Sequence, residues 1–257
     1  MPETEIVLLL CVAALLAGWV DAVVGGGGLI QIPALLVLLP GATPAQVLAT
    51  NKLSSVFGTA TAAWTYARRV RPDLRTALPM AAAATAGAAA GAACASLLPE
   101  SAFRPLVLVL LVLVGTYTLR RPALGEVQEL RFDGRQHLAA ALGAAVSIGF
   151  YDGIFGPGTG SFLVFALVAL MGYSFVQASA KARIVNLATN LGALAVFIPQ
   201  GAPMYGVGLA MAACNVLGGR LGAVTAISRG SRFVRVVFLV VVGVLLVRLA
   251  VDVARGG

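Results

Sequence analysis

One passage of this sequence occurs twice, and the second copy follows the first at a constant distance of 131 residues. In each copy an aspartate precedes a glycine-rich stretch by four residues, and a basic residue follows further along. The matched positions are Asp21 and Asp152, Gly25 and Gly156, Gly27 and Gly158, Gly41 and Gly172, Gln46 and Gln177, and Lys52 and Arg183. Duplicated apolar segments that are interrupted at matching positions indicate a transporter built from two structural repeats.

The composition places the chain in a lipid bilayer. Of its 257 residues 60% are hydrophobic and 11% are charged, and the mean hydropathy is +0.96. A soluble domain carries about a quarter charged residues, so the sequence predicts a polytopic membrane protein. The acidic start of the chain lacks the basic region of a secretory signal, and we expect the first apolar stretch to be retained.

The net charge of +8 comes from arginines that gather in three loops. They are Arg68, Arg69, Arg71 and Arg75, then Arg120, Arg121, Arg131 and Arg135, and finally Arg229, Arg232 and Arg235. Clusters of this kind are typical of the cytoplasmic loops of a membrane protein. Nucleic acid is excluded as a partner, because the sequence shows no basic face with interleaved aromatic residues.

Several kinds of chemistry are excluded by residue type. Cys11, Cys94 and Cys214 lie in apolar runs without metal-ligand spacing, and His137 is the only histidine. The glycine-rich stretch 156–161 is not part of a soluble βαβ unit, and a serine hydrolase would need a base within the membrane. We therefore expect no enzyme activity, no metal and no cofactor.

Ten apolar segments follow the duplication, five in each copy. They cover 6–20, 29–40, 46–67, 77–98 and 104–119, then 138–151, 160–172, 177–198, 205–227 and 235–252. The last three of each copy approach the roughly 20 residues that a spanning helix needs. The first two are shorter and flank the glycines, so we expect short helices that meet near the middle of the membrane. Backbone at that depth must be covered by protein or line a cavity.

The basic loops set the predicted topology. With 68–75 inside, segment 46–67 runs inward while its partner 177–198 runs outward, so the repeats are inverted. The predicted organisation is a first repeat at 1–123, a cytoplasmic linker at 124–137 and a second repeat at 138–257. The predicted fold class is an all-α membrane protein with both termini outside.

Ionisable side chains inside the predicted spans mark a functional site. Two cations, amide side chains and helix starts with free N–H groups suit a small oxyanion. The expected substrate site consists of Gly25, Gly26, Gly27, Gly28, Gln46, Thr50, Asn51, Lys52 and Ser55 from the first copy, and Gly156, Gly158, Thr159, Gly160, Gln177, Lys181, Arg183, Asn186 and Asn190 from the second. The expected partners are a small anion, the bilayer and, as an option, a second copy in a homodimer.

Two structural alternatives stay open. Lys52 and Arg183 could pair with Asp21 and Asp152 or cap helix ends instead of binding substrate, and the aspartates could release the cations when an anion arrives. The aspartates could carry protons, since burial raises the pKa of a carboxyl group. They could equally cap the turns around the glycines.

At these residues the chain resembles the TauE/SafE sulfite exporter family, also called the toluene sulfonate uptake permeases. The resemblance rests on Asp21 with the stretch 25–28, on the stretch 46–52, and on the second copy from Asp152 to Asn190. It implies a secondary transporter in the bacterial inner membrane, commonly an exporter, of sulfite or an organosulfonate, with proton coupling. The alternatives are an anion channel on the same fold, or a membrane scaffold or enzyme that transports nothing.

Overall fold

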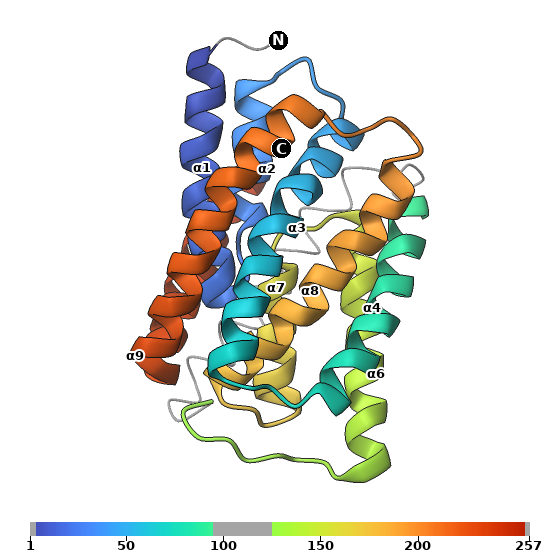
Figure 1. The fold of residues 1–257 in the computed structure, drawn as a ribbon, viewed down its shortest axis with the longest axis vertical. Helices are drawn as coiled ribbons and strands as arrows, with labels where there is room; N and C mark the ends of the chain where they lie inside the picture. The colour runs from blue at the N-terminus through green and yellow to red at the C-terminus, as the bar shows by residue number, and fades with distance from the viewer. Residues whose placement is uncertain (1–3, 95–124, 255–257) are drawn as a thin grey trace.

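The computed structural model describes residues 4–94 and 125–254, and within these ranges the regular structure is entirely helical. The helices lie side by side in a bundle (Figure 1). They are α1 (Thr4–Val24), α2 (Gly28–Leu38), α3 (Pro44–Arg69), α4 (Leu74–Cys94), α6 (Gly134–Ile154), α7 (Thr159–Phe165), the π-helical segment η3 (Ala166–Leu170), α8 (Phe175–Phe197) and α9 (Tyr205–Ala254). The predicted all-α fold is confirmed. The predicted segment 104–119 and the arginines at 120 and 121 lie outside the described residues.

Three of the described helices, α1, α4 and α6, are long and apolar enough to cross a membrane. Here α1 and α6 differ from the expectation of short segments, because each has 21 residues. The apolar runs were shorter than these helices, since α1 continues through Asp21 and α6 through the buried Asp152. Only their return helices are short, with 11 residues in α2 and seven in α7.

The helices around the two glycine breaks form hairpins that point in opposite directions. Figure 1 shows α1 running from the N-terminal end to the middle of the bundle and α2 returning, while α6 and α7 do the same from the opposite end. The hairpins touch at their tips, where the Ser161 amide donates to the Gly25 carbonyl oxygen at 3.0 Å. This arrangement fits inverted repeats, which stay a prediction for the chain as a whole.

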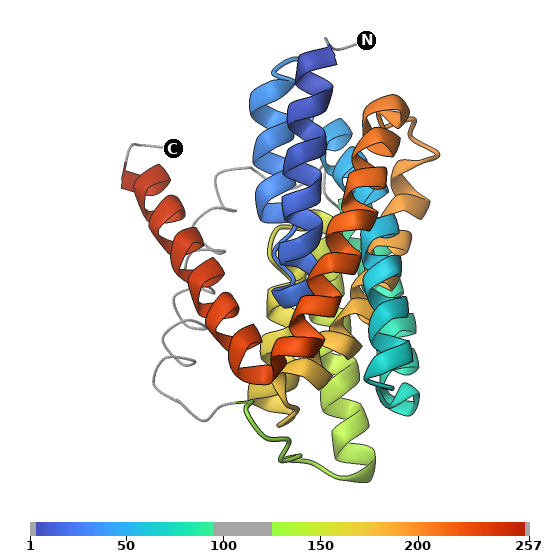
Figure 2. The same ribbon diagram turned by 60° about the vertical axis from the view of Figure 1, so that its left-hand side comes forward.

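Helix α9 contains both of the segments expected at 205–227 and 235–252, because two helices meet within it at a kink. Helix α9 is continuous except at Gly230, whose φ of 74° and ψ of −175° lie in a region open essentially only to glycine. Figure 2 shows the resulting sharp bend, after which the chain runs back along the bundle. A single glycine therefore replaces the expected arginine-rich loop.

Helices α3 and α8 form the centre of the bundle and run antiparallel (Figure 1). Helix α3 packs on α8 and α9, and α8 packs on α4 as well. Each begins at a capping hydroxyl, Thr43 or Ser174, which accepts a hydrogen bond from a backbone amide three residues later. Both helices are rich in buried polar residues, so they carry the polar centre of the molecule.

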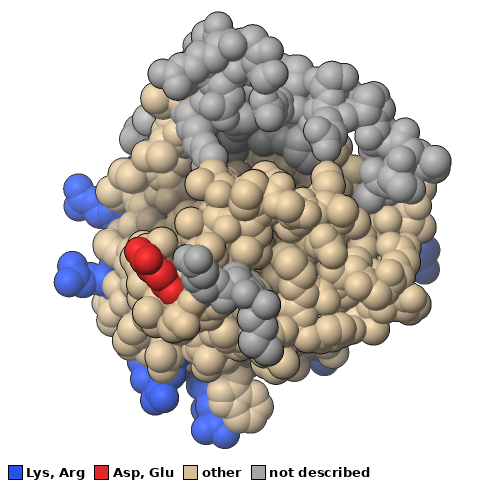
Figure 3. All heavy atoms as spheres, turned by 90° about the horizontal axis from the view of Figure 1, so that it is seen from above, with Lys and Arg blue, Asp and Glu red and all other residues tan. Residues whose placement is uncertain are grey.

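Charge is distributed unequally between the two ends of the bundle. Arg68 and Arg69 end α3, and Arg71 and Arg75 follow at the end opposite the N-terminus. Seen from the N-terminal end, Lys and Arg project only at the rim of the visible face (Figure 3). The described part of the chain thus has one arginine-rich end, as expected of a protein under the positive-inside rule.

Candidate functional site

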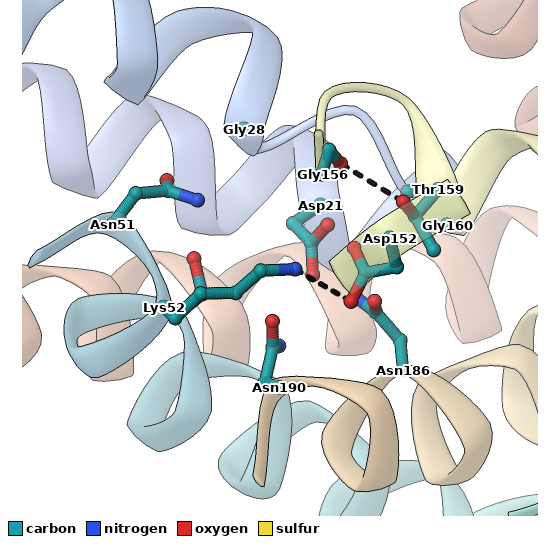
Figure 4. A pocket seen from close by; sticks show the side chains of 12 residues that line it. Asp21, Gly28, Asn51, Lys52, Asp152, Gly156, Thr159, Gly160, Asn186 and Asn190 are labelled. Carbon is teal, nitrogen blue, oxygen red and sulfur yellow. Dashed lines mark hydrogen bonds and ion pairs between the residues drawn. The ribbon is translucent and has the colours of Figure 1, made fainter. Parts of the chain in front are cut away.

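A small polar pocket lies where the two hairpins meet α3 and α8 (Figure 4). Its space of about 20 Å³ has room for about one water molecule. Residues from both copies line it: Asp21, Gly25, Gly28, Asn51, Lys52 and Ser55 from the first, and Asp152, Gly156, Thr159, Gly160, Asn186 and Asn190 from the second. All twelve are either residues of the expected substrate site or the two matched aspartates, Asp21 and Asp152.

A buried ion pair crosses the pocket between the two copies. The Lys52 amine on α3 lies 2.5 Å from Oδ2 of Asp152 on α6, and each side chain is only 2% exposed. Figure 4 shows the lysine reaching across the pocket to the carboxylate. Gly156 makes room for this amine, because a Cβ there would lie 3.3 Å from Nζ. The lysine thus binds the carboxylate that the glycine break of the other copy presents.

A second ion pair crosses in the opposite sense. Nη1 of Arg183 on α8 lies 3.0 Å from Oδ2 of Asp21 on α1 and also donates to the backbone oxygen of Asp21. The other carboxylate oxygen of Asp21 accepts from the Gly27 amide at 3.3 Å. Each cation is therefore paired with the aspartate of the other copy. Of the alternatives left open by the sequence, this conformation shows the one in which both cations pair with the aspartates.

The backbones of the two hairpins are in direct contact behind the pocket. Gly25 has a φ of +88°, and a Cβ on it would overlap the backbone of Gly160. A Cβ on Gly160 would in turn overlap Gly25. The contact is reinforced by Ser161, whose hydroxyl donates to the Val24 oxygen at 3.0 Å. Sequence analysis missed Ser161, because a serine after a glycine-rich stretch has no distinguishing pattern.

Several buried polar atoms near the pocket have no hydrogen-bond partner among the described residues. They include Nε and Nη2 of Arg183, the Asn190 amide nitrogen and the Asn51 side-chain oxygen. Arg183 itself lies behind the pocket wall, where its Nη2 is 2.9 Å from the Cβ position of Gly160. Unused donors on a buried cation suit an anion, because leaving such groups unpaired is costly. Gln31, also missed, is a fully buried amide one turn beyond Gly28 with both polar atoms unpartnered.

Comparison with known proteins identifies the family. The profile of the family Sulfite exporter TauE/SafE matches residues 10–249. The chain belongs to the TauE/SafE family. The resemblance inferred from the repeated motifs is confirmed.

Relatives of this TauE/SafE protein are named as transporters. It is 37% identical to the probable membrane transporter protein ORF9 of a Sinorhizobium species. The 243 aligned residues make up 95% of this chain and 92% of the relative. It is 35% identical to the probable membrane transporter protein YfcA of Escherichia coli K12, and the 240 aligned residues make up 93% of this chain and 87% of that relative. No solved structure matches it. The protein is a membrane transporter of the TauE/SafE type and not an enzyme.

Some expected site residues of the TauE/SafE protein lie away from the pocket lining. Gln46 belongs to a capping box at the start of α3, where its side chain accepts from the Thr43 amide at 2.9 Å. Gln177 is the corresponding N3 residue of α8. Gly26, Gly27 and Gly158 belong to the hairpin turns but do not line the pocket. Thr50 and Lys181 contact loops elsewhere, as described below.

Proposed function

We propose that this protein is a secondary transporter that exports a small sulfur-containing oxyanion, such as sulfite or an organosulfonate, by alternating access. One observation carries the proposal: two buried cations, Lys52 and Arg183, lie at the contact of two oppositely directed hairpins. Unpartnered donors on Arg183 and Asn190 add to them. The protein lies in the bacterial inner membrane with its arginine-rich end in the cytoplasm, which the positive-inside rule favours.

In this conformation the two ion pairs occupy both cations. The present space is too small for an oxyanion, because it holds about one water molecule. Binding therefore requires the pairs Lys52–Asp152 and Arg183–Asp21 to separate, so that the cations turn from carboxylate to substrate. A site whose contacts must rearrange for binding links substrate occupancy to the conformation of the hairpins.

Proton coupling follows from the charges around the pocket. Two cations face two carboxylates, so an arriving anion adds an uncompensated negative charge to a buried site. A proton on one aspartate restores the balance and also supplies a hydrogen-bond donor. The anion and a proton then move in the same direction.

The coupling proposal predicts the behaviour of neutral variants. Asp152→Asn and Asp21→Asn should keep oxyanion binding but lose its dependence on pH, because asparagine mimics the protonated acid. Binding of an organosulfonate to each purified variant from acid to mildly alkaline pH measures this, because a sulfonate keeps its single negative charge over that range. An unchanged wild-type pH profile in both variants would mean that the aspartates are structural.

The substrate proposal predicts that the shape of the Arg183 guanidinium matters as well as its charge. Arg183→Lys should weaken oxyanion binding about tenfold or more, because lysine lacks the unpartnered Nε and Nη2 donors. A thermal-shift screen with sulfite, sulfate, thiosulfate and sulfonates is the measurement, since ligand at 100 times its Kd stabilises by about 2.7 kcal/mol. The matched control is Arg220→Lys, at an exposed position on α9, which should leave the shift unchanged.

Transport by liposomes that contain the protein separates a coupled carrier from an anion channel. A carrier accumulates the oxyanion against its gradient when a proton gradient is imposed, whereas a channel only dissipates the anion gradient. Absence of both binding and flux for every sulfur oxyanion tested would reject the proposed substrate class.

A further inference from the structure

A second buried lysine ties α8 to the loop that follows α3. The Lys181 amine, whose side chain is fully buried, donates to the backbone oxygen of Asp73 at 2.8 Å and lies 3.5 Å from its carboxylate. Asp73 immediately precedes α4, at the arginine-rich end of the bundle. Neither the pocket nor the two central ion pairs use this lysine.

A neutral contact of the same kind ties α3 to the loop that follows α8. The Met204 amide donates to the hydroxyl of Thr50, which is fully buried, at 3.0 Å. Met204 immediately precedes α9. This contact lies at the end of the bundle where α3 begins and α8 ends (Figure 1).

The two contacts are related by the duplication. Lys181 follows Thr50 by 131 residues, and Met204 follows Asp73 by the same 131 residues. The residue types differ completely, so the matched motifs of the two copies do not reveal the relation. In both cases a residue in the second turn of one central helix contacts the end of the loop that follows the other central helix. Lys181 on α8 contacts Asp73 just before α4, and Thr50 on α3 contacts Met204 just before α9. Lys52 and Arg183 each lie two residues further along the same helices.

We propose that these contacts are the two gates of the transporter, with Lys181–Asp73 closing the pocket toward the arginine-rich end and Thr50–Met204 closing it toward the other. The proposal rests on the alternating access proposed above. Both contacts hold α3 against α8 around the small pocket, so the pocket opens to one end when one contact breaks and the other holds. The four residues position the helices and do not touch the substrate.

The gates are unequal. Asp73 also accepts from the Thr76 hydroxyl at 2.7 Å and from the Arg75 amide at 3.0 Å, and the Lys181 amine lies 4.8 Å from the Tyr173 ring centroid. Burial raises the pKa of Asp73, but the hydrogen bonds from Thr76 and Arg75 and the charge of Lys181 outweigh it, so its pKa lies below the ordinary value. The carboxylate is therefore ionised at neutral pH.

A charge-assisted contact is roughly twice as strong as a neutral one. We therefore expect the resting protein to open more readily at the Thr50 end. Because the arginine-rich end is the one held by charge, the unequal gates also give the protein a preferred resting orientation.

The test measures access to the pocket from each side without any substrate. The full chain carries a reporter cysteine, Ser55→Cys, with Cys11, Cys94 and Cys214 changed to alanine. Right-side-out and inside-out vesicles are treated with a membrane-impermeant charged methanethiosulfonate. Lys181→Met should raise the labelling rate about tenfold or more from the arginine-rich end alone, and Thr50→Val about fivefold from the other end alone. Without either change, labelling should be faster from the Thr50 end.

Matched variants separate gating from general damage. Lys181→Arg keeps the charge and Thr50→Ser keeps the hydroxyl, so both should label like the parent. Thr61→Val removes an exposed α3 hydroxyl that bonds only its own helix and should change nothing. Asp73→Asn keeps the backbone acceptor and tests the charge if Lys181→Met fails to fold.

Equal effects from both sides, or no effect in variants that elute as folded protein, would overturn the gate assignment. Side-specific labelling together with a failed oxyanion screen would reject the substrate and leave the gates. Oxyanion transport together with unchanged labelling would support the substrate and reject the gates.

Discussion

Lys52→Met is expected to lower the free energy of unfolding by about 3–5 kcal/mol, the cost of breaking a buried ion pair from one side. Asp152, with its side chain 2% exposed, would keep its carboxylate but lose the amine 2.5 Å away. Thermal unfolding of the purified protein in detergent, followed by intrinsic fluorescence, measures the loss. The effect should far exceed that of Glu126→Gln, which removes a half-exposed partner at 3.9 Å and should cost less than about 1 kcal/mol.

The double variant Lys52→Met with Asp152→Leu is the decisive comparison. It removes both charges and leaves an apolar pair, so it should recover most of the stability lost in the single variant. It should bind no oxyanion, because an apolar pair can replace the ion pair in packing but cannot supply the positive charge that Lys52 offers to the anion. If the double variant is as unstable as the sum of the two single variants, the two side chains do not interact in the folded protein.

The duplication made the polar centre predictable. Because one constant offset relates Asp21 to Asp152 and Lys52 to Arg183, the sequence alone placed these four residues at equivalent positions of two copies. Charged side chains inside apolar segments must be paired or functional, whatever the fold. The residues that line the pocket were therefore among those expected. Which cation meets which aspartate was open, since that depends on how the hairpins cross.

Helix lengths were less predictable, because apolar runs end where a polar side chain begins. Helix α1 continues through Asp21 because Arg183, remote in sequence, compensates its charge. The bend at Gly230 resembled a loop because arginines surround it. Local composition records neither compensation by a distant residue nor a turn made by one glycine.

The gate contacts were beyond sequence analysis for a different reason. Thr50 and Lys181 share a repeat position but not a residue type. Their hydrogen bonds go to backbone groups of Met204 and Asp73, although the Lys181 amine also lies 3.5 Å from the Asp73 carboxylate. Almost every residue type carries the same backbone donor and acceptor, so a sequence does not show which residue will use them. Lys181 was therefore grouped with the substrate cations, although the structure directs it to a loop.

Gly25→Ala and Gly160→Ala are expected to destabilise the protein strongly and to abolish transport. Each added Cβ would overlap the backbone of the other hairpin, so the tips that carry both aspartates would have to separate. Overpacking costs about 1–3 kcal/mol. Gly25→Ala adds about 1–3 kcal/mol of backbone strain at its φ of +88°. Gly25→Ala should therefore be the worse of the two, in thermal unfolding and in yield of folded protein.

The matched control is Gly143→Ala in the middle of α6, where a Cβ would meet nothing within 4 Å. Because glycine within a helix is less stable than alanine by about 0.5–1 kcal/mol, this control should leave the protein intact or slightly stabilised. Transport in liposomes and unfolding in detergent should both separate it from the two hairpin variants. If Gly160→Ala behaves like Gly143→Ala, the hairpin tips can move apart at little cost. The close contact at Gly25 would then not be what holds the two ion pairs in register.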